Sequence, residues 1–146
     1  PEKLIPLTIL NFLNKKKMGL YGSGKQVRDW LYVEDHVNAI YKVFKKGKIG
    51  NTYNIGGKNE KSNLEIVNLI AEIFNDIRPI KNFDYKSLIT FVSDRPGHDF
   101  RYAINSQKIF KELGWFVKKD FKNNLKKTII WYINNKKWWK EIFNEK

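Results

Sequence analysis

Apolar residues recur every three or four positions in several stretches of this chain, which is the spacing of one face of an α-helix. The clearest stretch is 64–76, which has large apolar residues on one face and Ser62 or Asn63 in position to cap its start. The same periodicity predicts further helices at 6–13, beginning at Pro6 with Ile9, Leu10 and Leu13 on one face, at 33–46 before Gly47, at 106–113 before Gly114, and at 121–142 after Asp120.

Short apolar runs between these helices predict strands. Residues 18–33 are typical of a strand, a glycine turn and a second strand, and residues 51–57, NTYNIGG, indicate another short strand. Two more are expected at 88–92 and 101–104, on either side of a Pro-Gly turn. Alternating helices and strands favour an α/β fold, or an α+β arrangement if the piece stands alone. The regular succession of a complete nucleotide-binding sheet is missing, so half of a fold is expected.

The composition narrows the class of protein. A chain of 146 residues has the size of one domain, and without cysteine it can have no disulfide, thiolate zinc site or cysteine nucleophile. We expect a cytoplasmic protein, because no apolar run approaches membrane length and the first residues do not resemble a signal peptide. The chain begins with Pro1, so we expect a piece of something longer.

The net charge of +13 raises the possibility of a basic nucleic-acid-binding module. Only four of the 28 basic residues are arginine, and the lysines are spread along the whole chain together with abundant Asn and Ile. Compositional drift therefore explains much of the charge, and we expect no specific nucleic-acid partner.

Several kinds of catalytic site find no support in the sequence. Gly22 and Gly24 begin a G-x-G-x-x-G pattern, but Val27 holds the third glycine position and a strand follows instead of a helix. His36 and His98 have no further ligands at metal spacing, and no serine lies on a strand-to-helix elbow. The Tyr-x-x-x-Lys spacing occurs three times. Tyr21/Lys25 lies in a glycine turn where the two side chains would not align, whereas Tyr41/Lys45 and Tyr132/Lys136 fit packed tyrosines beside solvated lysines on amphipathic helices.

A set of loop residues is suited to holding phosphate and a flat ring. Arg95 precedes the rigid Pro96-Gly97 corner, where its guanidinium could reach an anion. Each member also has an ordinary structural interpretation, such as a local ion pair for Arg95, an Arg28–Asp29 pair, a helix cap for Asn63, hairpin packing for Tyr21 or a solvated end for Lys3. The set consists of Lys3, Tyr21, Arg28, Asn63, Arg95 and His98.

Several motifs in order along the chain resemble the C-terminal part of the dTDP-glucose 4,6-dehydratases, a family of nucleotide-sugar enzymes in the extended short-chain dehydrogenase/reductase superfamily. RDWLYVEDH and NIGG are shared by many extended-family enzymes, whereas PEKLIP, GGKNEKSN and DRPGHDFRYAI are characteristic of the dTDP-glucose branch. The resemblance runs from Pro1 to about Trp139.

The resemblance implies a nucleotide-sugar-binding function for this chain. Such enzymes use tightly held NAD to oxidise the sugar at C4, after which water leaves across C5 and C6 and the hydride returns to C6. The residues that bind NAD and perform this chemistry belong to an N-terminal part that this sequence lacks, so no catalytic, cofactor or metal residue is expected here. The substrate contacts implied are Lys3 and Leu4 for the diphosphate, Gly19, Leu20 and Tyr21 for thymine, and Arg28, Asn63, Arg95 and His98 for phosphate and ribose.

One departure from the family pattern affects the base slot. Family members commonly have Pro-Ile-Tyr where this chain has Gly19-Leu20-Tyr21, so a looser thymine contact is expected.

The resemblance also implies how the chain is organised and what it binds. Residues 1–146 would form one nucleotide-sugar-binding C-terminal domain without the NAD-binding Rossmann half, and segment 32–56 would pack onto that cofactor domain or recruit another copy. Expected partners are a dTDP-sugar and the N-terminal NAD-binding part, in a pathway to deoxysugars such as rhamnose and surface polysaccharide. The chain alone is expected to be inactive.

Three alternatives stay open. The chain could belong to a related nucleotide-sugar epimerase or a GDP-mannose dehydratase, which would bind a different base. It could be a basic nucleic-acid-binding module, or the product of a split or decayed gene.

Overall fold

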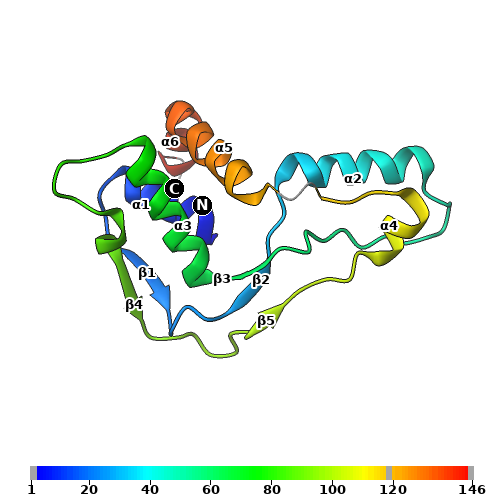
Figure 1. Ribbon diagram of the computed structural model, residues 1–146, viewed down its shortest axis with the longest axis horizontal. Helices are drawn as coiled ribbons and strands as arrows, with labels where there is room; N and C mark the ends of the chain where they lie inside the picture. The colour runs from blue at the N-terminus through cyan, green and yellow to red at the C-terminus, as the bar shows by residue number, and fades with distance from the viewer. Residues whose placement is uncertain (1–2, 118–119, 145–146) are drawn as a thin grey trace.

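The structure, a computed structural model, describes residues 3–117 and 120–144, so Pro1 and Glu2 of the first motif lie outside the described residues. Helices and strands alternate along the chain, as the sequence predicts (Figure 1). The helices are α1 (Leu4–Leu13), α2 (Val33–Lys46), α3 (Asn63–Ile77), the 3-10 turn η1 (Tyr85–Leu88), α4 (Gln107–Leu113), α5 (Phe121–Asn134) and α6 (Lys136–Asn144). The strands are β1 (Met18–Tyr21), β2 (Val27–Asp29), β3 (Glu60–Ser62), β4 (Ile89–Val92) and β5 (Arg101–Tyr102).

Two of the predicted helices differ from the structure by more than one residue. Helix α1 begins at Leu4, so Pro6 lies inside the first turn, where its missing N–H leaves no helical hydrogen bond unmade. Its buried side includes Phe12, whereas Leu13 is only partly buried. The predicted helix 121–142 is two helices, because the backbone leaves the helical conformation at Asn135 (φ −108°, ψ 46°), whose side-chain amide donates to the carbonyl of Trp131.

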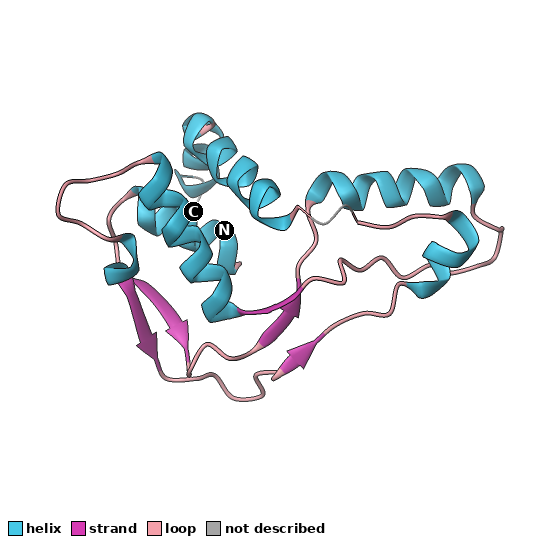
Figure 2. Cartoon of the chain, in the orientation of Figure 1, coloured by secondary structure: helices cyan, strands magenta, loops and turns pink. Residues whose placement is uncertain are grey.

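The strands form two small sheets (Figure 2). Strands β1 and β4 pair in parallel, with Tyr21 opposite Val92 at their ends. In the second sheet β2 lies in the middle, antiparallel to β3 and parallel to β5. The two strands predicted around the Gly22–Gly24 turn are therefore both present, but they belong to different sheets and do not form a hairpin.

The strand predicted at 51–57 is wrong, because these residues are irregular and pair with no strand in the described part of the chain. A strand is stable only where a neighbour accepts its backbone hydrogen bonds. The segment is held in another way: the carboxylate of Asp29 accepts hydrogen bonds from the N–H groups of Gly57 and Asn59, at 2.8 and 2.9 Å. Tyr53 and Ile55 pack beside a small cluster of α2 and α4 residues around Ala39 and Ile109.

Helix α2 lies with α4 to one side of the main body (Figure 1). Only Ala39 of α2 is buried, although the helix is strongly amphipathic. Its apolar face is open, with Phe44 80 % exposed and Val37, Ile40 and Tyr41 more than half exposed. No helix among the described residues is long and apolar enough to cross a membrane.

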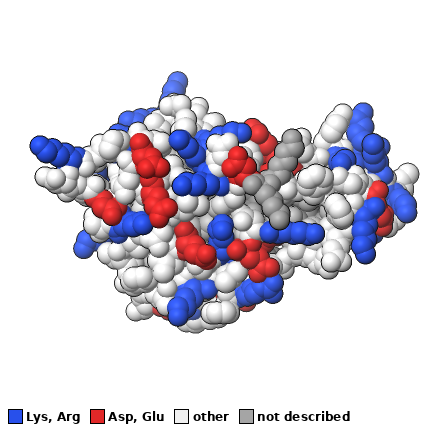
Figure 3. Space-filling view, viewed as in Figure 1, with Lys and Arg blue, Asp and Glu red and all other residues white. Residues whose placement is uncertain are grey.

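Charged side chains of both signs lie on the face shown in Figure 3. Lys and Arg lie among Asp and Glu over the main body, whereas the α2–α4 side shows mostly basic residues. This distribution agrees with the even spread of lysine along the sequence.

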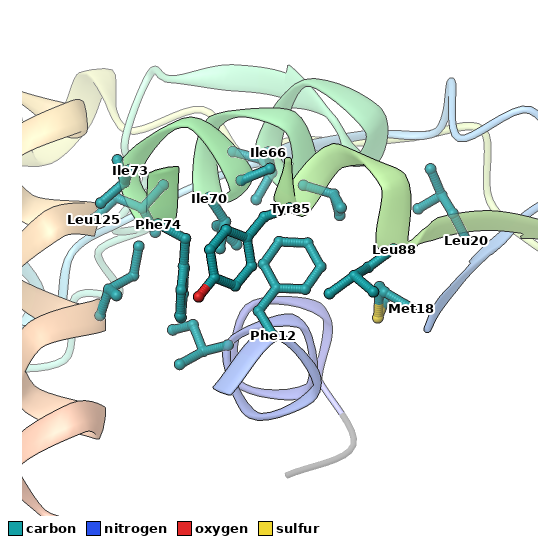
Figure 4. Close-up of a cluster of buried hydrophobic side chains, with 14 residues drawn as sticks. Phe12, Met18, Leu20, Ile66, Ile70, Ile73, Phe74, Tyr85, Leu88 and Leu125 are labelled. Atoms are coloured by element: carbon teal, nitrogen blue, oxygen red, sulfur yellow. The ribbon is translucent and has the colours of Figure 1, made fainter. Parts of the chain in front are cut away.

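The main core lies between α1, α3, α5 and the β1–β4 sheet. Buried residues of α3, including Ile66, Ile70 and Phe74, form its centre, as the helical spacing predicts (Figure 4). Phe12 and Tyr85 pack on Phe74 with ring centroids 5.6 and 5.0 Å away. Ser62 and Glu65 form a capping box, so the N-cap of α3 is Ser62 and not Asn63. This core fixes the N-terminus of α3 beside the two sheets.

Candidate functional site

Two connections run side by side from the first sheet to the second. Residues 22–26 join β1 to β2, and residues 93–100 join β4 to β5. Because β1 pairs with β4 and β2 pairs with β5, both in parallel, the connections begin and end as neighbours. Hydrogen bonds mark both ends, from Gly22 N–H to Val92 O at 2.9 Å and from Val27 N–H to Phe100 O at 2.8 Å. Loop 93–100 therefore lies against the glycine turn instead of forming a hairpin tip.

Asp94 ties the two connections together. Its Oδ2 accepts a 2.7 Å hydrogen bond from Nε2 of the buried Gln26, and its Oδ1 accepts one from Nδ1 of His98, also at 2.7 Å. The backbone N–H of Arg95 donates to Oδ1 at 2.9 Å. The hydrogen bond from His98 is the main cause that holds the pKa of Asp94 below its ordinary value, so the carboxylate stays charged at neutral pH.

His98 and Tyr21 meet where the first sheet ends. Only 7 % of the His98 side chain is exposed, and its ring meets the Tyr21 ring edge to face with centroids 6.2 Å apart. Tyr21 itself is about half exposed. The two rings form an aromatic wall beside the Pro-Gly corner, next to solvent.

Two of the predicted arginines carry charge that no carboxylate neutralises in the described residues. The side chain of Arg95 makes no hydrogen bond or ion pair there, and Gly97 turns the chain beyond it with φ 67°. Arg28 donates to the backbone carbonyls of Val27 and Asp99, at 2.7 and 2.9 Å. The Arg28–Asp29 pair considered from the sequence does not form, because Asp29 accepts from the 57–59 segment.

Arg101, the other arginine of the DRPGHDFRYAI motif, has a structural partner. Its guanidinium donates two hydrogen bonds to the carboxylate of Glu60, at 2.7 and 2.8 Å, and joins β5 to β3 across the sheet. This pairing raises the pKa of Arg101 and lowers that of Glu60. Arg101 is therefore not available to an anion in the way that Arg95 is.

Asn63 is the first residue of α3, beside the same turn. Its backbone N–H donates to the carbonyl of Gln26 at 3.0 Å, and its side chain makes no hydrogen bond within the described ranges. Since Ser62 caps the helix, the Asn63 amide is not needed for capping. A polar amide at a helix N-terminus suits an anionic ligand.

The predicted base slot on β1 offers less side-chain surface than expected. Leu20 is 1 % exposed and belongs to the core, so only its backbone could face a ligand. A Cβ at Gly19 would come 3.2 Å from Cγ1 of Val92, so a larger residue there would have to move its neighbour. Of these three residues, Tyr21 alone presents an exposed side chain.

Lys3 and Leu4 lie at the start of α1. Lys3 is exposed and precedes the helix, while Leu4 packs against the main core. No hydrogen bond or ion pair joins either residue to loop 93–100 in the part of the chain that the structure describes. The structure thus places five of the predicted residues around the glycine turn and loop 93–100, namely Tyr21, Arg28, Asn63, Arg95 and His98. Lys3 and Leu4 share none of the hydrogen bonds of this group in the described part of the chain.

Gln26 and Asp94 are central to this arrangement, but sequence reasoning did not single them out. Asp94 is visible within the DRPGHD motif, whereas its bond to Gln26 joins positions 68 residues apart. A pairing at that separation leaves no signal in a single sequence.

The glycine turn does not fit a dinucleotide cofactor. A Cβ at Gly22 would lie 2.9 Å from Oδ2 of Asp94, and one at Gly24 would lie 2.5 Å from Cδ2 of Leu20. The space beside these two glycines is therefore occupied by side chains of the protein itself. The turn also leads into a strand and not into a helix N-terminus. Likewise, the described residues contain no cluster of His, Cys, Asp and Glu that could hold a metal ion.

Two arginines without a carboxylate partner, a helix N-terminus and an aromatic wall thus lie around one turn of an α/β fold, a combination of groups suited to an anion. A family model described as GDP-mannose 4,6 dehydratase matches residues 1–128, and the chain belongs to this family. Within it, the chain is similar to proteins named dTDP-glucose 4,6-dehydratase. That of Neisseria meningitidis serogroup B is 51 % identical over 147 residues, covering 99 % of this chain and 41 % of the relative.

Solved structures of dTDP-glucose 4,6-dehydratases are also similar to this chain. The dTDP-glucose 4,6-dehydratase of Bacillus anthracis in complex with NAD has a TM-score of 0.84 and 47 % identity, covering 97 % of this chain and 42 % of that one. The Streptomyces venezuelae enzyme with NAD and TYD bound has a TM-score of 0.84 and 37 % identity, covering 95 % and 41 %. The fold is that of the extended short-chain dehydrogenase/reductases, and the chain spans about two fifths of the length of the curated relatives it matches.

Proposed function

We propose that this chain is the substrate-binding part of a dTDP-glucose 4,6-dehydratase and that it holds the nucleotide end of a dTDP-sugar. Arg28 and Arg95 would bind the diphosphate, with the Asn63 amide at the helix N-terminus beside them. Tyr21 and His98 would lie along the ribose and thymine. Lys3 and Leu4 would reach the diphosphate from the start of α1, and the backbone of Gly19 and Leu20 would border the base.

The observation that carries this proposal is the pairing of the two connections. It places Arg28, Asn63 and Arg95 around one turn, although they are distant in sequence, and leaves both guanidinium groups without a carboxylate partner among the described residues. Arginine gives planar, paired hydrogen bonds that match phosphate oxygens. A structural role alone would favour neutralised arginines like Arg101.

NAD chemistry is not assigned to these residues. Both solved relatives described above were crystallised with NAD, but the glycine turn of this chain is filled by Asp94, Leu20 and Leu64. We infer that a complete enzyme holds NAD on another part, and that the 146 residues alone do not catalyse dehydration. The open face of α2 is where segment 32–56 would meet that part. A cytoplasmic location agrees with such a biosynthetic role.

Relatives that are about 50 % identical to this chain are named dTDP-glucose 4,6-dehydratase, which favours dTDP-glucose over GDP-mannose as the substrate. The family model that matches bears the GDP-mannose name. Epimerases are similar at only 20–22 % identity, which shows the fold alone. A nucleic-acid module receives less support, because basic side chains lie among acidic ones on the face shown in Figure 3.

Calorimetric titration of the purified chain with dTDP, GDP and NAD tests the proposal. Because one wall of the expected pocket is lacking, we expect dTDP binding in about the millimolar range, equivalent to about 4 kcal/mol. GDP should bind more weakly, and NAD should not bind stoichiometrically. A spectroscopic assay for the 4-keto product should show no turnover of dTDP-glucose.

Equal affinity for dTDP, GDP and inorganic diphosphate would contradict a base-reading site. Retention on heparin that moderate salt removes, without preference for dTDP, would favour the nucleic-acid alternative. Turnover of dTDP-glucose by the chain alone would overturn the proposed division of labour.

A further inference from the structure

Asp94 combines two properties that need a joint explanation. It is a carboxylate one residue from Arg95, in a site proposed to bind an anion, where its negative charge opposes the ligand. It is also the point where Gln26, Arg95 and His98 all donate hydrogen bonds. We propose that Asp94 is the positioning residue of this site, and that it acts through His98 by fixing the ring with its proton on Nδ1 and Nε2 available to the nucleotide.

The hydrogen bonds of Asp94 point to a role in holding its neighbours. Oδ1 accepts from the backbone of Arg95 and from His98, and Oδ2 accepts from Gln26. The same Oδ2 lies against the turn at Gly22, where a Cβ would come 2.9 Å from it. Both oxygens thus accept hydrogen bonds from within the protein, and three donors offset part of the negative charge, although the Asp94 side chain is 40 % exposed.

The contact with His98 decides which ring nitrogen is free. A carboxylate can only accept, so the nitrogen 2.7 Å from Oδ1 must be Nδ1–H. In the neutral ring Nε2 is then an acceptor, which suits a ribose hydroxyl. The ring cannot easily turn to exchange its nitrogens, because its side chain is 7 % exposed and packs edge to face on Tyr21.

Gln26 links Asp94 to the N-terminus of α3. The residue is only 6 % exposed, and its Nε2 must face Asp94 because a carbonyl there would meet a second acceptor. Its backbone carbonyl accepts from the N–H of Asn63 at 3.0 Å. Asp94 is therefore linked to His98, Arg95 and the N-terminus of α3 through one short network.

The inference rests on the proposed function for its ligand, but its first test needs none. The chain has two histidines, so the ring ¹⁵N signals of the labelled chain can be assigned with a His36→Gln variant. The neutral His98 ring should show the Nδ1–H tautomer. The Asp94→Asn variant, whose amide cannot accept from both Gln26 and His98, should show a mixture of tautomers. Glu60→Gln is the matched control, because it removes a half-exposed carboxylate from the Arg101 pair in the neighbouring sheet.

The second test is titration with dTDP followed by NMR. Loss of the charged acceptor should weaken dTDP binding about tenfold in Asp94→Asn, whereas Glu60→Gln should bind like the parent chain. A Gln26→Leu variant removes only the donor to Oδ2, so it should keep the Nδ1–H tautomer and bind dTDP with intermediate affinity.

The outcomes separate the two proposals. An Nε2–H tautomer in the parent chain overturns the role of Asp94, and this holds even if Asp94→Asn does not fold. A changed tautomer with unchanged dTDP affinity, or an unchanged tautomer in Asp94→Asn, also overturns it. If the parent chain does not bind dTDP at all, the proposed function fails, while the tautomer in the free protein still decides whether Asp94 sets the ring.

Discussion

At the scale of single residues, the structure separates arginines that hold the fold from arginines that are free to bind. Arg101 donates both hydrogen bonds of a paired contact to Glu60, whereas the Arg95 guanidinium has no partner among the described residues. Sequence alone treats both as charged residues of one motif. The difference arises because Arg101 lies on β5, from which its side chain reaches Glu60 of β3 across β2, whereas Arg95 lies in the loop before the Pro-Gly corner.

We therefore predict that Arg95→Lys weakens dTDP binding without changing stability. Lysine keeps the charge but loses the paired geometry, which should cost about 1–3 kcal/mol of binding free energy. Calorimetric titration measures the affinity, and the melting temperature should barely move. Arg78→Lys is the control, because Arg78 follows the far end of α3, about 22 Å along the helix axis from Asn63. A variant that unfolds while binding dTDP normally would make Arg95 a structural residue.

Stability at acid pH follows from a second group of residues. Hydrogen bonds lower the pKa of several carboxyl groups, chiefly from Arg101 to Glu60, from Ser62 to Glu65, from Asn75 to Asp84 and from His98 to Asp94. A group whose pKa is lower in the folded state stabilises it above the unfolded pKa, and this contribution is lost as pH falls through the folded pKa.

The melting temperature should therefore be steady near neutral pH. It should fall progressively below about pH 4.5, which is the ordinary pKa of the Glu carboxyls in this group. Thermal melts between pH 7 and pH 2.5 measure it. The Asp84→Asn variant should be less stable at pH 7 and should lose less on acidification than the parent chain. A melting temperature that rises as pH falls from 5 to 3 would contradict the sign of these contributions.

At the scale of elements, α3 links the core to the candidate site because it contributes residues to both. Its buried face includes Ile66, Ile70 and Phe74, and its first residue lies beside the glycine turn. The position of Asn63 in the site therefore depends on how the helix begins. The capping box fixes that start, with Ser62 Oγ accepting from Glu65 N–H and the Glu65 carboxylate accepting from Ser62 N–H.

Removing the cap should destabilise the fold. We expect Ser62→Ala to lower the free energy of unfolding by about 1 kcal/mol, because it leaves an N-terminal N–H of the helix without its partner. Urea unfolding measures this difference. Ser93→Ala, an exposed serine for which no side-chain hydrogen bond is found in the described residues, is the control and should change little. Equal effects of the two substitutions would show that the capping box does not hold the helix start.

At the scale of the whole molecule, α2 is the element that the rest of the chain leaves uncovered. Val37, Ile40, Tyr41 and Phe44 form an open apolar face, and the adjoining segment 51–57 lacks a strand partner within the described residues. These two features would be explained together if another unit supplied a sheet and a surface for the helix. That packing stays a prediction, because only the exposure is observed.

An open apolar face of this kind should make the isolated chain associate with itself. We expect sedimentation experiments to show association that increases with concentration. The double variant Ile40→Lys, Phe44→Lys should reduce it without loss of helicity measured by circular dichroism. His36→Lys with Asn38→Lys, which adds the same two positive charges at exposed polar positions of the same helix, is the matched control. A parent chain that stays monomeric at high concentration would contradict the prediction.

The sequence by itself determined the elements that depend on local patterns. Helical spacing, Ser62, Gly47 and Gly114 placed α2, α3 and α4 correctly, because capping and amphipathic periodicity act within one or two turns. The motifs around Arg28, Asn63 and Arg95 also named the candidate site. By contrast, NTYNIGG has the composition of a strand but not the conformation, because a strand depends on a partner that may lie anywhere in the fold.

Only the tertiary structure decided how the two connections meet. The parallel pairing of β1 with β4 and of β2 with β5 set loop 93–100 against the glycine turn, and this contact joined Gln26 to Asp94 across 68 residues. In the same tertiary structure the Leu20 side chain is buried and Arg101 forms an ion pair with Glu60, whereas Arg95 has no ion-pair partner among the described residues. Such outcomes depend on which distant segments share a sheet, and the free energy of that choice comes from long-range packing that no local pattern records.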